Sequence, residues 1–438
     1  MNPAGPVKIL FVGDIHLGRR ASRIPGSAWE MGDFRQQDIS PLGAWRRVVQ
    51  AAIDHEVQAV ALAGDVVHQD DDLFEARAHL EQGIRRLNQA QIEVVAVAGN
   101  HDTRVLPALA DVIEGLHLLG RDGTWSSFSI AENVRLAGWS FPQRHHTTNP
   151  LQQAPPAAES GLVTLGLLHC DLNAARSNYA PVSATELEQV GYQGWALGHI
   201  HTPDPVPGPD APQRPFYLGS ISGATPNETG AHGPVLATIS TDGDEQWQRL
   251  VLAPLRWEHL DVPVENLATD LAGKELTADL QRYLMEFVNE LELDAAWETQ
   301  EARALGLRLT LTGAHSQAAE LLQAAQDIAP DDLVTLVDGR VVFIEKIICE
   351  VTVPMDLTEL ARRTDLPGLL AQEILALSEG DPSTAAILAQ ARLSVDQVAT
   401  PARFERETWS DDELRSQLVR AGRQALNALL SQTKGQAS

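Results

Sequence analysis

The 438-residue chain is poor in cysteine and in aromatic side chains: it has two cysteines, Cys170 and Cys349, and 5% aromatic residues. Two cysteines so far apart in sequence offer no disulfide framework, and this usage suits a reducing compartment. The chain also lacks an apolar run long enough to span a bilayer, and no basic and apolar signal region precedes its first predicted strand. We therefore expect a soluble, cytoplasmic protein that does not enter a membrane.

Positive charge is scarce as well. The chain has 33 Lys and Arg residues against 59 Asp and Glu residues, which gives a formal net charge of −26. Because phosphate contacts draw their affinity from basic side chains that release counterions, this balance opposes general binding to a polyanion. The length is too great for one ordinary core, so two or three domains are expected.

Polar residues follow several short apolar runs, at the point where each run ends. The runs 8–13, 58–64, 92–99 and 162–168 lead into Asp14, Asp65, Asn100 and His169. Runs of this kind predict strands buried on both faces, and segments 44–55 and 73–90 between the first three predict helices. The order favours a predominantly parallel sheet. Because ligands bind beyond the carboxyl ends of such strands, these side chains are expected to converge.

Two pairs of residues strengthen this expectation. Asp14 with His16, and His199 with His201, are separated by two positions, so both members of each pair face the same side of extended backbone. Glycines at 13, 64, 99 and 198 would let the backbone approach bound ions closely. A mixed set of carboxylate, amide and imidazole ligands suits Mn²⁺, Fe²⁺ or Zn²⁺ better than Ca²⁺, and Mn²⁺ is the first choice. The sequence thus predicts one dinuclear metal site.

The ordered motifs Asp-x-His, Gly-Asp, Gly-Asn-His-Asp, His and Gly-His-x-His resemble those of the calcineurin-like metallophosphoesterases. The resemblance implies an α/β fold in which a β-sandwich is flanked by helices (αββα). It also implies two divalent ions: Asp14, His16 and His201 would bind one, Asn100, His169 and His199 the other, and Asp65 would bridge them.

Local detail resembles the SbcD branch of DNA-repair exonucleases, and within it the YhaO-like subgroup. The motifs that carry this resemblance are Asp14-Ile15-His16-Leu17-Gly18, His68 three residues after Asp65, Ser177-Asn178-Tyr179-Ala180-Pro181, Trp195-Ala196-Leu197-Gly198-His199-Ile200-His201, Tyr217-Leu218-Gly219-Ser220 and Arg256-Trp257-Glu258-His259. They fall within residues 7 to 262, and the resemblance beyond that is one of layout only.

Three side chains beside the ligands are candidates for catalysis. His101 could protonate the leaving alkoxide or stabilise the charge of the transition state, with Asp102 as its orienting partner. His68 is a second candidate acid or strand-positioning residue; the alternative is a solvent-facing histidine next to the acidic run 70–72. Arg19, Arg20 and Arg23 belong to a basic island that could guide a DNA backbone, although a solvated charged face fits the pattern equally.

Three domains are expected along the chain. Residues 1–262 would form the metallophosphoesterase nuclease domain, and residues 263–355 a small α/β capping domain read as helix, strand, helix, strand, with strands at 307–312 and 341–353. Residues 356–438 would form a C-terminal helical region for partner docking. The Pro-rich loop 203–215, with six prolines in thirteen residues, would rim the active site.

The C-terminal region carries a capping-box signature, Ser410-Asp411-Asp412-Glu413, ahead of an apolar face made of Leu414, Leu418, Ala425, Leu429 and Leu430. This helix either packs on its own domain or docks a partner. The resemblance implies DNA and an SbcC-like coiled-coil ATPase as partners and leaves room for a homodimer. No nucleotide-binding P-loop is present in the sequence, so any ATP-driven step would need another chain.

The sequence therefore predicts a two-metal phosphodiesterase that acts at DNA ends, as a 3′ to 5′ exonuclease with some endonuclease capacity. Two alternatives stay open: a small-molecule or cyclic-nucleotide phosphodiesterase, and a DNA-end-binding scaffold of an SbcC-like ATPase complex. The roughly 170 residues that follow the core favour the nuclease over an enzyme for small substrates.

Overall fold

The structure, a computed structural model, describes residues 5–174, 176–208, 214–292, 302–398 and 410–435. Its strands are β1 (Val7–Val12), β2 (Ala59–Leu62), β3 (Glu93–Ala96), β4 (Leu116–Leu118), β5 (Trp125–Ala131), β6 (Val134–Trp139), β7 (Val163–His169), β8 (Gly194–Gly198), β9 (Phe216–Tyr217), β10 (Val235–Ile239), β11 (Glu245–Arg249), β12 (Leu255–Pro263), β13 (Ala304–Thr312), β14 (Val334–Val337) and β15 (Arg340–Cys349).

Its helices are α1 (Gly26–Met31), α2 (Pro41–Asp54), α3 (Leu73–Gln89), α4 (Val105–Ala110), α5 (Ala184–Gln189), α6 (Lys274–Asn289), α8 (Ala318–Asp327), α9 (Leu357–Leu360), α10 (Leu366–Glu379), α11 (Ala385–Val398) and α12 (Asp411–Gly435). The chain divides into two compact units. The first comprises residues 1–258, 292–307 and 334–345, and the second residues 259–291, 308–333 and 346–438. Because these units are discontinuous in sequence, the predicted domain boundaries after residues 262 and 355 stay a proposal.

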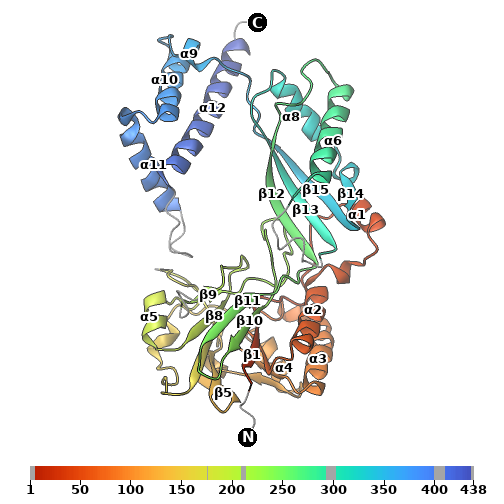
Figure 1. Cartoon of the computed structure of the whole chain (residues 1–438), viewed down its shortest axis with the longest axis vertical. Coiled ribbons are helices and arrows are strands. Elements are labelled where there is room, and N and C mark those ends of the chain that lie inside the picture. The colour runs from red at the N-terminus through yellow and green to blue at the C-terminus, as the bar shows by residue number, and fades with distance from the viewer. Residues whose placement is uncertain (1–4, 175, 209–213, 293–301, 399–409, 436–438) are drawn as a thin grey trace. The chain divides into compact units, whose positions relative to one another are not determined.

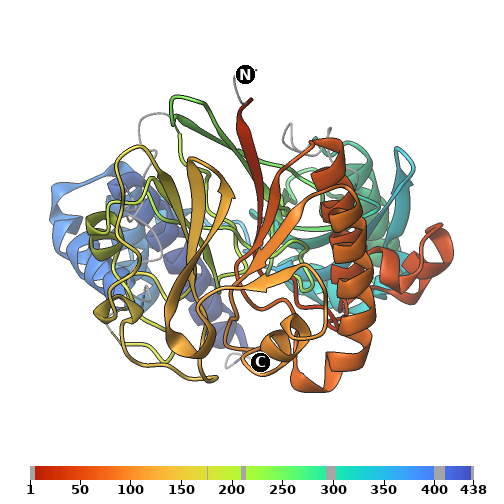
Figure 2. The same cartoon turned by 90° about the horizontal axis from the view of Figure 1, so that it is seen from below.

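The first unit contains two sheets that pack face to face (Figures 1 and 2). The six-stranded sheet has the order β11-β10-β1-β2-β3-β4, and its β1 to β4 run parallel. The five-stranded sheet has the order β5-β6-β7-β8-β9, with β6 to β9 parallel. The αββα sandwich expected from the sequence is confirmed.

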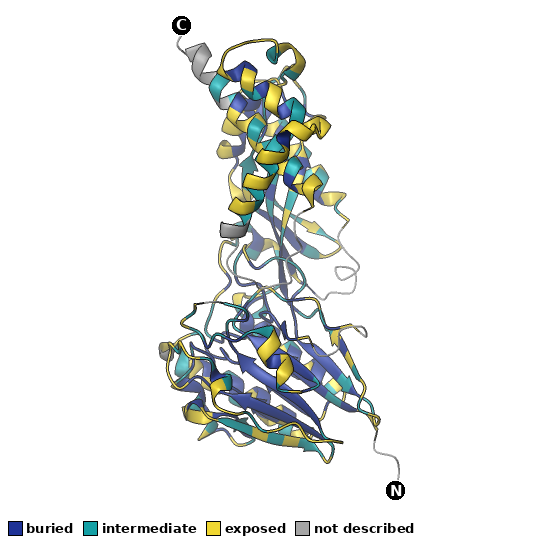
Figure 3. Ribbon diagram, turned by 90° about the vertical axis from the view of Figure 1, so that its left-hand side faces the viewer, coloured by how far each residue is buried: buried dark blue, intermediate teal, exposed yellow. Residues whose placement is uncertain are grey.

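Strand alternation explains why the sandwich has three apolar layers. In β1, Leu10 and Val12 belong to the core under helices α2 and α3, whereas Ile9 and Phe11 belong to the core between the two sheets. Because successive side chains point to opposite faces, a strand buried on both faces must be apolar throughout. The outer core of the second sheet holds Trp139 and other side chains beneath α5. Figure 3 shows these strands almost wholly buried.

The helix predicted at 44–55 begins earlier, at Pro41. Proline is favoured at the first helical position because a backbone N–H there would have no intrahelical acceptor, so its absence costs nothing. The buried face of α2 presents Trp45, Val48 and Val49 to the sheet. Burial of each such apolar side chain contributes roughly 1.5–3 kcal/mol to the free energy of unfolding, relative to leaving it exposed.

After residue 265 the described elements α6, β13, α8, β14 and β15 follow the expected order of helix, strand, helix, strand, with one additional strand. Strands β12, β13, β15 and β14 form one four-stranded sheet, in that order. Strand β14 pairs antiparallel with β15 as a hairpin that sequence reading missed, and β15 ends at Cys349, four residues before the predicted end. The short run 334–337 is followed by a turn at Asp338 and Gly339, which was the available signal.

The C-terminal helices α9 to α12 have a small core of Ala371, Ile374 and Leu426. The predicted capping box is confirmed, because the Glu413 backbone N–H donates to Ser410 Oγ and the Ser410 N–H donates to Glu413 Oε2. The predicted apolar face is wrong at one position: Ala425 is exposed, and the neighbouring Leu426 is buried instead. A difference of one residue corresponds to a rotation of about 100° on a helix.

Glu245 on β11, the edge strand of the six-stranded sheet, gives the fold a pH dependence. Burial raises the pKa of Glu245 to about 7, although its hydrogen bond from Trp247 Nε1 acts in the opposite direction. The folded chain then binds more protons here than the unfolded chain between about pH 4.5 and pH 7, so stability falls as pH rises through this window.

We expect Glu245→Gln to remove this loss, because a neutral amide still accepts the Trp247 hydrogen bond. The melting temperature at pH 8 should rise by roughly 2–4 °C, and the melting temperature at pH 4.5 should change little. The exposed Asp242→Asn is the matched control. An equal shift at both pH values would contradict the assignment.

Candidate metal centre

Seven potential ligands come from the carboxyl ends of strands in both sheets of the sandwich. Asp14, Asp65 and Asn100 follow β1, β2 and β3, which are neighbours in the first sheet. His169 ends β7, and His199 follows β8, its neighbour in the second sheet. Because parallel strands end at the same edge, side chains from distant parts of the sequence meet.

One group of ligand atoms belongs to Asp14, His16 and His201, whose atoms all lie within 4.8 Å of one another. The Nε2 atoms of His16 and His201 are 2.9 Å apart. The carboxylate of Asp14 accepts the backbone N–H of His199 at 3.1 Å from each oxygen, which ties the end of β8 to the end of β1.

A second group consists of Asp14, Asp65 and His169, all buried, with ligand atoms again within 4.8 Å of one another. Asp65 Oδ2 lies 3.5 Å from His169 Nε2 and 3.8 Å from His16 Nε2. This carboxylate therefore lies between a histidine of the first group and a histidine of the second, whereas Asp14 belongs to both groups.

The surroundings of His169 fit a cation. Its Nδ1–H donates to the Ala63 carbonyl oxygen at 2.9 Å, so Nε2 of the neutral ring carries a lone pair. That lone pair faces Asn100 Oδ1 at 3.0 Å and Asp65 Oδ2, which are also acceptors. These three atoms together match the donor set of a metal ion.

Burial shifts the pKa values of the cluster so that the neutral form of each side chain is favoured. It lowers the pKa of His16 and of His169 well below the usual value, with help from neighbouring histidines, so both rings are neutral. It raises the pKa of Asp65 well above the usual value, and the carboxyls of Asp102 and Asp14 raise it further. Among the described residues, the Asp65 carboxylate contacts the imidazoles of His16 and His169, so a divalent cation would compensate its buried charge.

The backbone at the site is held in an uncommon conformation. Positive φ angles occur at His16 (52°), Asp65 (48°) and His199 (105°). Gly99 is required by close packing, because a Cβ at this position would lie 2.2 Å from Asp65 Oδ1. Residues in such conformations persist where the surrounding structure over-determines them, which is frequent at functional sites.

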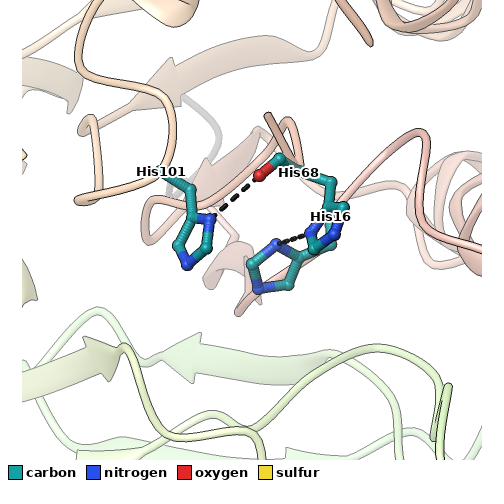
Figure 4. A group of neighbouring side chains, drawn as sticks. All are labelled: His16, His68 and His101. Atoms are coloured by element: carbon teal, nitrogen blue, oxygen red, sulfur yellow. Dashed lines mark hydrogen bonds between the residues drawn. The ribbon is translucent and has the colours of Figure 1, made fainter. Parts of the chain in front are cut away.

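The structure brings His16, His68 and His101 together at one side of the cluster (Figure 4). His101 Nδ1 bonds the His68 carbonyl oxygen at 2.9 Å, and the rings of His68 and His101 stack with centroids 5.8 Å apart. His68 Nδ1 lies 3.4 Å from His16 Nδ1. The backbone N–H of His101 donates to Asp65 Oδ1 at 2.9 Å, which ties the candidate catalytic histidine to the central carboxylate.

Asp102 has partners other than the expected His101 ring. Its buried carboxylate accepts backbone N–H groups of Gly99 at 2.8 Å, Val66 at 2.7 Å and Val67 at 3.4 Å. Burial raises its pKa to about 6, against the lowering effect of these bonds. Asp102 thus braces the two loops after β2 and β3.

Two acidic side chains that sequence reading missed contact the ligand histidines. Asp171 Oδ1 lies 3.2 Å from His199 Nε2, and Glu228 Oε1 lies 3.4 Å from His201 Nδ1. Glu228 is buried and also accepts from Arg19 at 2.6 Å and from the Ala224 N–H at 3.0 Å. A carboxylate on the far nitrogen of a ligand histidine fixes its tautomer and orientation.

Of the three predicted DNA-contact arginines, Arg19 is turned inward. Besides its ion pair with Glu228, Arg19 Nη1 lies 3.2 Å from His201 Nδ1. Arg20 and Arg23 are exposed. The charge of Arg19 is therefore largely balanced within the site.

Replacing Glu228 with glutamine should weaken metal binding. The amide cannot hold His201 in the same protonation state, and loss of such a partner costs roughly 10- to 100-fold in metal affinity. We expect this loss in a calorimetric titration with Mn²⁺, with a smaller loss for Glu228→Asp. The exposed Glu132→Gln is the control. Unchanged affinity in Glu228→Gln would show that Glu228 serves the loop alone.

Among the described residues, no helix is both long enough and apolar enough to cross a membrane. Comparison with known proteins gives a match of residues 7–203 to the calcineurin-like phosphoesterase family. The uncharacterized metallophosphoesterase YhaO of Bacillus subtilis is 25% identical over 241 residues, which cover 53% of this chain and 57% of YhaO.

The DNA double-strand break repair protein Mre11 of Haloferax volcanii is 26% identical over 318 residues, covering 72% of this chain and 65% of that protein. Mre11 of Halobacterium salinarum is 28% identical over 247 residues, covering 54% and 57%. The chain thus matches less than two thirds of the length of each relative. Residues 7–203, which match the calcineurin-like phosphoesterase family, supply all seven of the converging side chains.

Proposed function

We propose that the chain is a metal-dependent DNA exonuclease of the cytoplasm, with two divalent ions, Mn²⁺ by preference, held by Asp14, His16, Asp65, Asn100, His169, His199 and His201. The observation that carries the proposal is the position of Asp65 Oδ2, between His169 Nε2 at 3.5 Å and His16 Nε2 at 3.8 Å. The relatives named as DNA double-strand break repair proteins support a DNA substrate over a small one.

When bound, a pair of divalent ions supplies Lewis-acid charge on a phosphodiester and an activated water at neutral pH. The chain's own residues arrange the reaction. Asp65 and Asp14 are buried carboxyl groups that would hold the ions. Glu228 and Asp171 orient the ligand rings of His201 and His199.

His101 is proposed as the residue that protonates the leaving oxygen or stabilises charge on the phosphoryl group. Its Nδ1 is engaged by the His68 carbonyl oxygen, so Nε2 is the atom that can carry a proton to the substrate. His68 stacks against this ring and positions it. Asp102 contributes indirectly, because it holds the loop on which His101 lies.

The test is digestion of end-labelled single- and double-stranded DNA with added Mn²⁺, alongside bis(p-nitrophenyl) phosphate. We expect mononucleotide release from DNA ends in the 3′ to 5′ direction, abolished by a chelator. Hydrolysis of the chromogenic ester with intact DNA would favour a small-molecule or cyclic-nucleotide phosphodiesterase. Binding of DNA ends without hydrolysis of either substrate would favour a scaffold.

A partner is proposed because the chain as a whole is acidic, with a net charge of −26. Much of the affinity for DNA would then come from a coiled-coil ATPase of the SbcC type. The C-terminal helices offer apolar side chains for such a helix: Leu366 is 62% exposed, Leu369 52% and Leu393 54%. Apolar surface of this kind, on helices with a small core of their own, supports docking.

The double variant Leu366→Asp, Leu369→Asp should lose the ATPase in a pull-down, because two carboxylates would be desolvated at the interface. Metal content should stay at the wild-type level. The control is Val112→Asp, which changes a side chain that is 54% exposed on the first unit. Recovery of the ATPase at wild-type yield would leave these helices with a purely structural role.

A further inference from the structure

A cavity of about 640 Å³ opens beside the metal centre, on the side of His68 and His101. Asn100 and His101 line it, so the cavity is continuous with the cluster of ligands. The other walls come from the segment after β6, which contributes Arg144, and from the start of α4, which contributes Arg104. Two loops of the first unit that are distant in sequence thus place a guanidinium each on one cavity.

The cavity carries two arginines although the protein as a whole is acidic. Within the described part of the chain, neither the Arg104 nor the Arg144 guanidinium has an ion-pair partner, and both residues are exposed. Arg19, by contrast, is paired with Glu228. Among the described side chains that line the cavity, two arginines stand against the single carboxylate of Asp71.

Arg144 lies close to the site itself. Its side chain lines the same cavity as the ligand Asn100 and the candidate catalytic His101. A substrate phosphate held in this cavity would therefore lie within reach of both the guanidinium and the His101 ring.

The size of the cavity limits its ligand. Small-ligand pockets fall roughly between 300 and 1,000 Å³, so this one admits a single nucleotide and excludes a duplex. Guanidinium groups bind phosphate oxygens through paired hydrogen bonds, and neutral donors at Gln69, Thr103 and Gln143 line the same walls. The chemistry fits a phosphate with an attached nucleoside.

We infer that this cavity is a subsite for a single-stranded DNA segment, in which Arg104 and Arg144 bind a backbone phosphate that adjoins the scissile one. The inference rests on the proposed nuclease function and deepens it. Strand ends would have to separate before cleavage, because only an unpaired nucleotide enters the cavity beside His101.

The experiment measures binding of a fluorescent single-stranded oligonucleotide by anisotropy, in chelator so that cleavage cannot occur, at several salt concentrations. We expect Arg104→Ala with Arg144→Ala to raise Kd roughly tenfold or more. The slope of log K against log salt should become shallower by about 0.7, the value for one neutralised phosphate on a single strand, because both arginines bind the same phosphate. The double lysine variant should keep the slope and lose part of the affinity.

The matched control is Arg85→Ala. Arg85 lines a cavity of similar size, about 630 Å³, beside Glu93 at the opposite, amino-terminal end of β3, and it is paired with Glu81 at 3.0 Å. This variant should bind the oligonucleotide as the wild type does. Melting temperature and metal content of every variant, measured in parallel, separate a binding defect from misfolding.

A double alanine variant with wild-type Kd and wild-type salt slope would overturn the subsite. An equal loss of affinity in Arg85→Ala would overturn it too, because the effect would then be one of total charge. Failure of the nuclease function is a different result: it would appear in the wild type, as DNA left intact with Mn²⁺ present.

Discussion

The Asp65→Ala variant is expected to lose its two metal ions and to hydrolyse neither DNA nor a chromogenic phosphodiester. The carboxylate lies between the two groups of ligand atoms, so its removal takes a ligand from both ions at once. Elemental analysis after dialysis against Mn²⁺ measures the effect. Asp111→Ala, which removes an exposed carboxylate paired with Arg121, should bind metal normally.

The isosteric Asp65→Asn variant separates metal binding from folding. In the metal-free chain, burial raises the pKa of Asp65 because the charged carboxylate is poorly solvated. A neutral amide relieves that cost and can still accept the His101 backbone N–H. We expect metal-free Asp65→Asn to melt at or above the temperature of the metal-free wild type. Two ions bound to either variant would refute the bridging role.

His101→Asn should retain both metal ions and lose turnover on DNA by roughly 10²-fold or more, the scale of one general acid or one charge-stabilising donor. The ring is held by the His68 carbonyl oxygen through Nδ1 and stacks on His68, so Nε2 is the atom that can act on a substrate. Steady-state cleavage of end-labelled DNA, with metal content determined on the same sample, is the measurement.

The control for this variant is His117→Asn. His117 is a half-buried histidine on β4, paired with Glu93 at 3.1 Å, and its loss should leave turnover unchanged. A wild-type rate for His101→Asn would rule out a catalytic role, and loss of an ion would make the residue a ligand.

The converging set of side chains was accessible from the sequence because strands and ligands share one local pattern. Each buried strand is a short apolar run, and its carboxyl end is marked by the residue that breaks the run, as at Asp65 or Asn100. A doubly covered parallel sheet then fixes where those ends lie. Local patterning and global fold agree at these positions, which makes them predictable.

Side chains that act through other residues were not accessible in this way. Glu228, Asp171 and Arg144 lie on irregular segments, where neither the period of a strand nor that of a helix indicates a direction. Their partners are set by contacts between distant parts of the chain, as with Glu228 and Arg19. The antiparallel pairing of β10 with β1 was not predictable for the same reason, because the sequence of β10 does not indicate which strand it pairs with.

Asp102 illustrates how adjacency in sequence misleads. It follows His101 directly, which suggested an orienting role, but its oxygens are taken by backbone N–H groups of Gly99 and Val66. A buried carboxylate accepts hydrogen bonds from nearby donors that have no other partner, and the loops around a metal site contain several backbone N–H groups of this kind. The sequence shows the carboxylate and not the competing donors.

The most direct test of the dinuclear nuclease is a titration of the metal-free chain with Mn²⁺, with the number of ions bound and the cleavage of end-labelled single-stranded DNA recorded on the same samples. The account predicts a stoichiometry of two ions per chain, and cleavage that rises as the second ion binds. Saturation at one ion, or intact DNA with both ions bound, would contradict it.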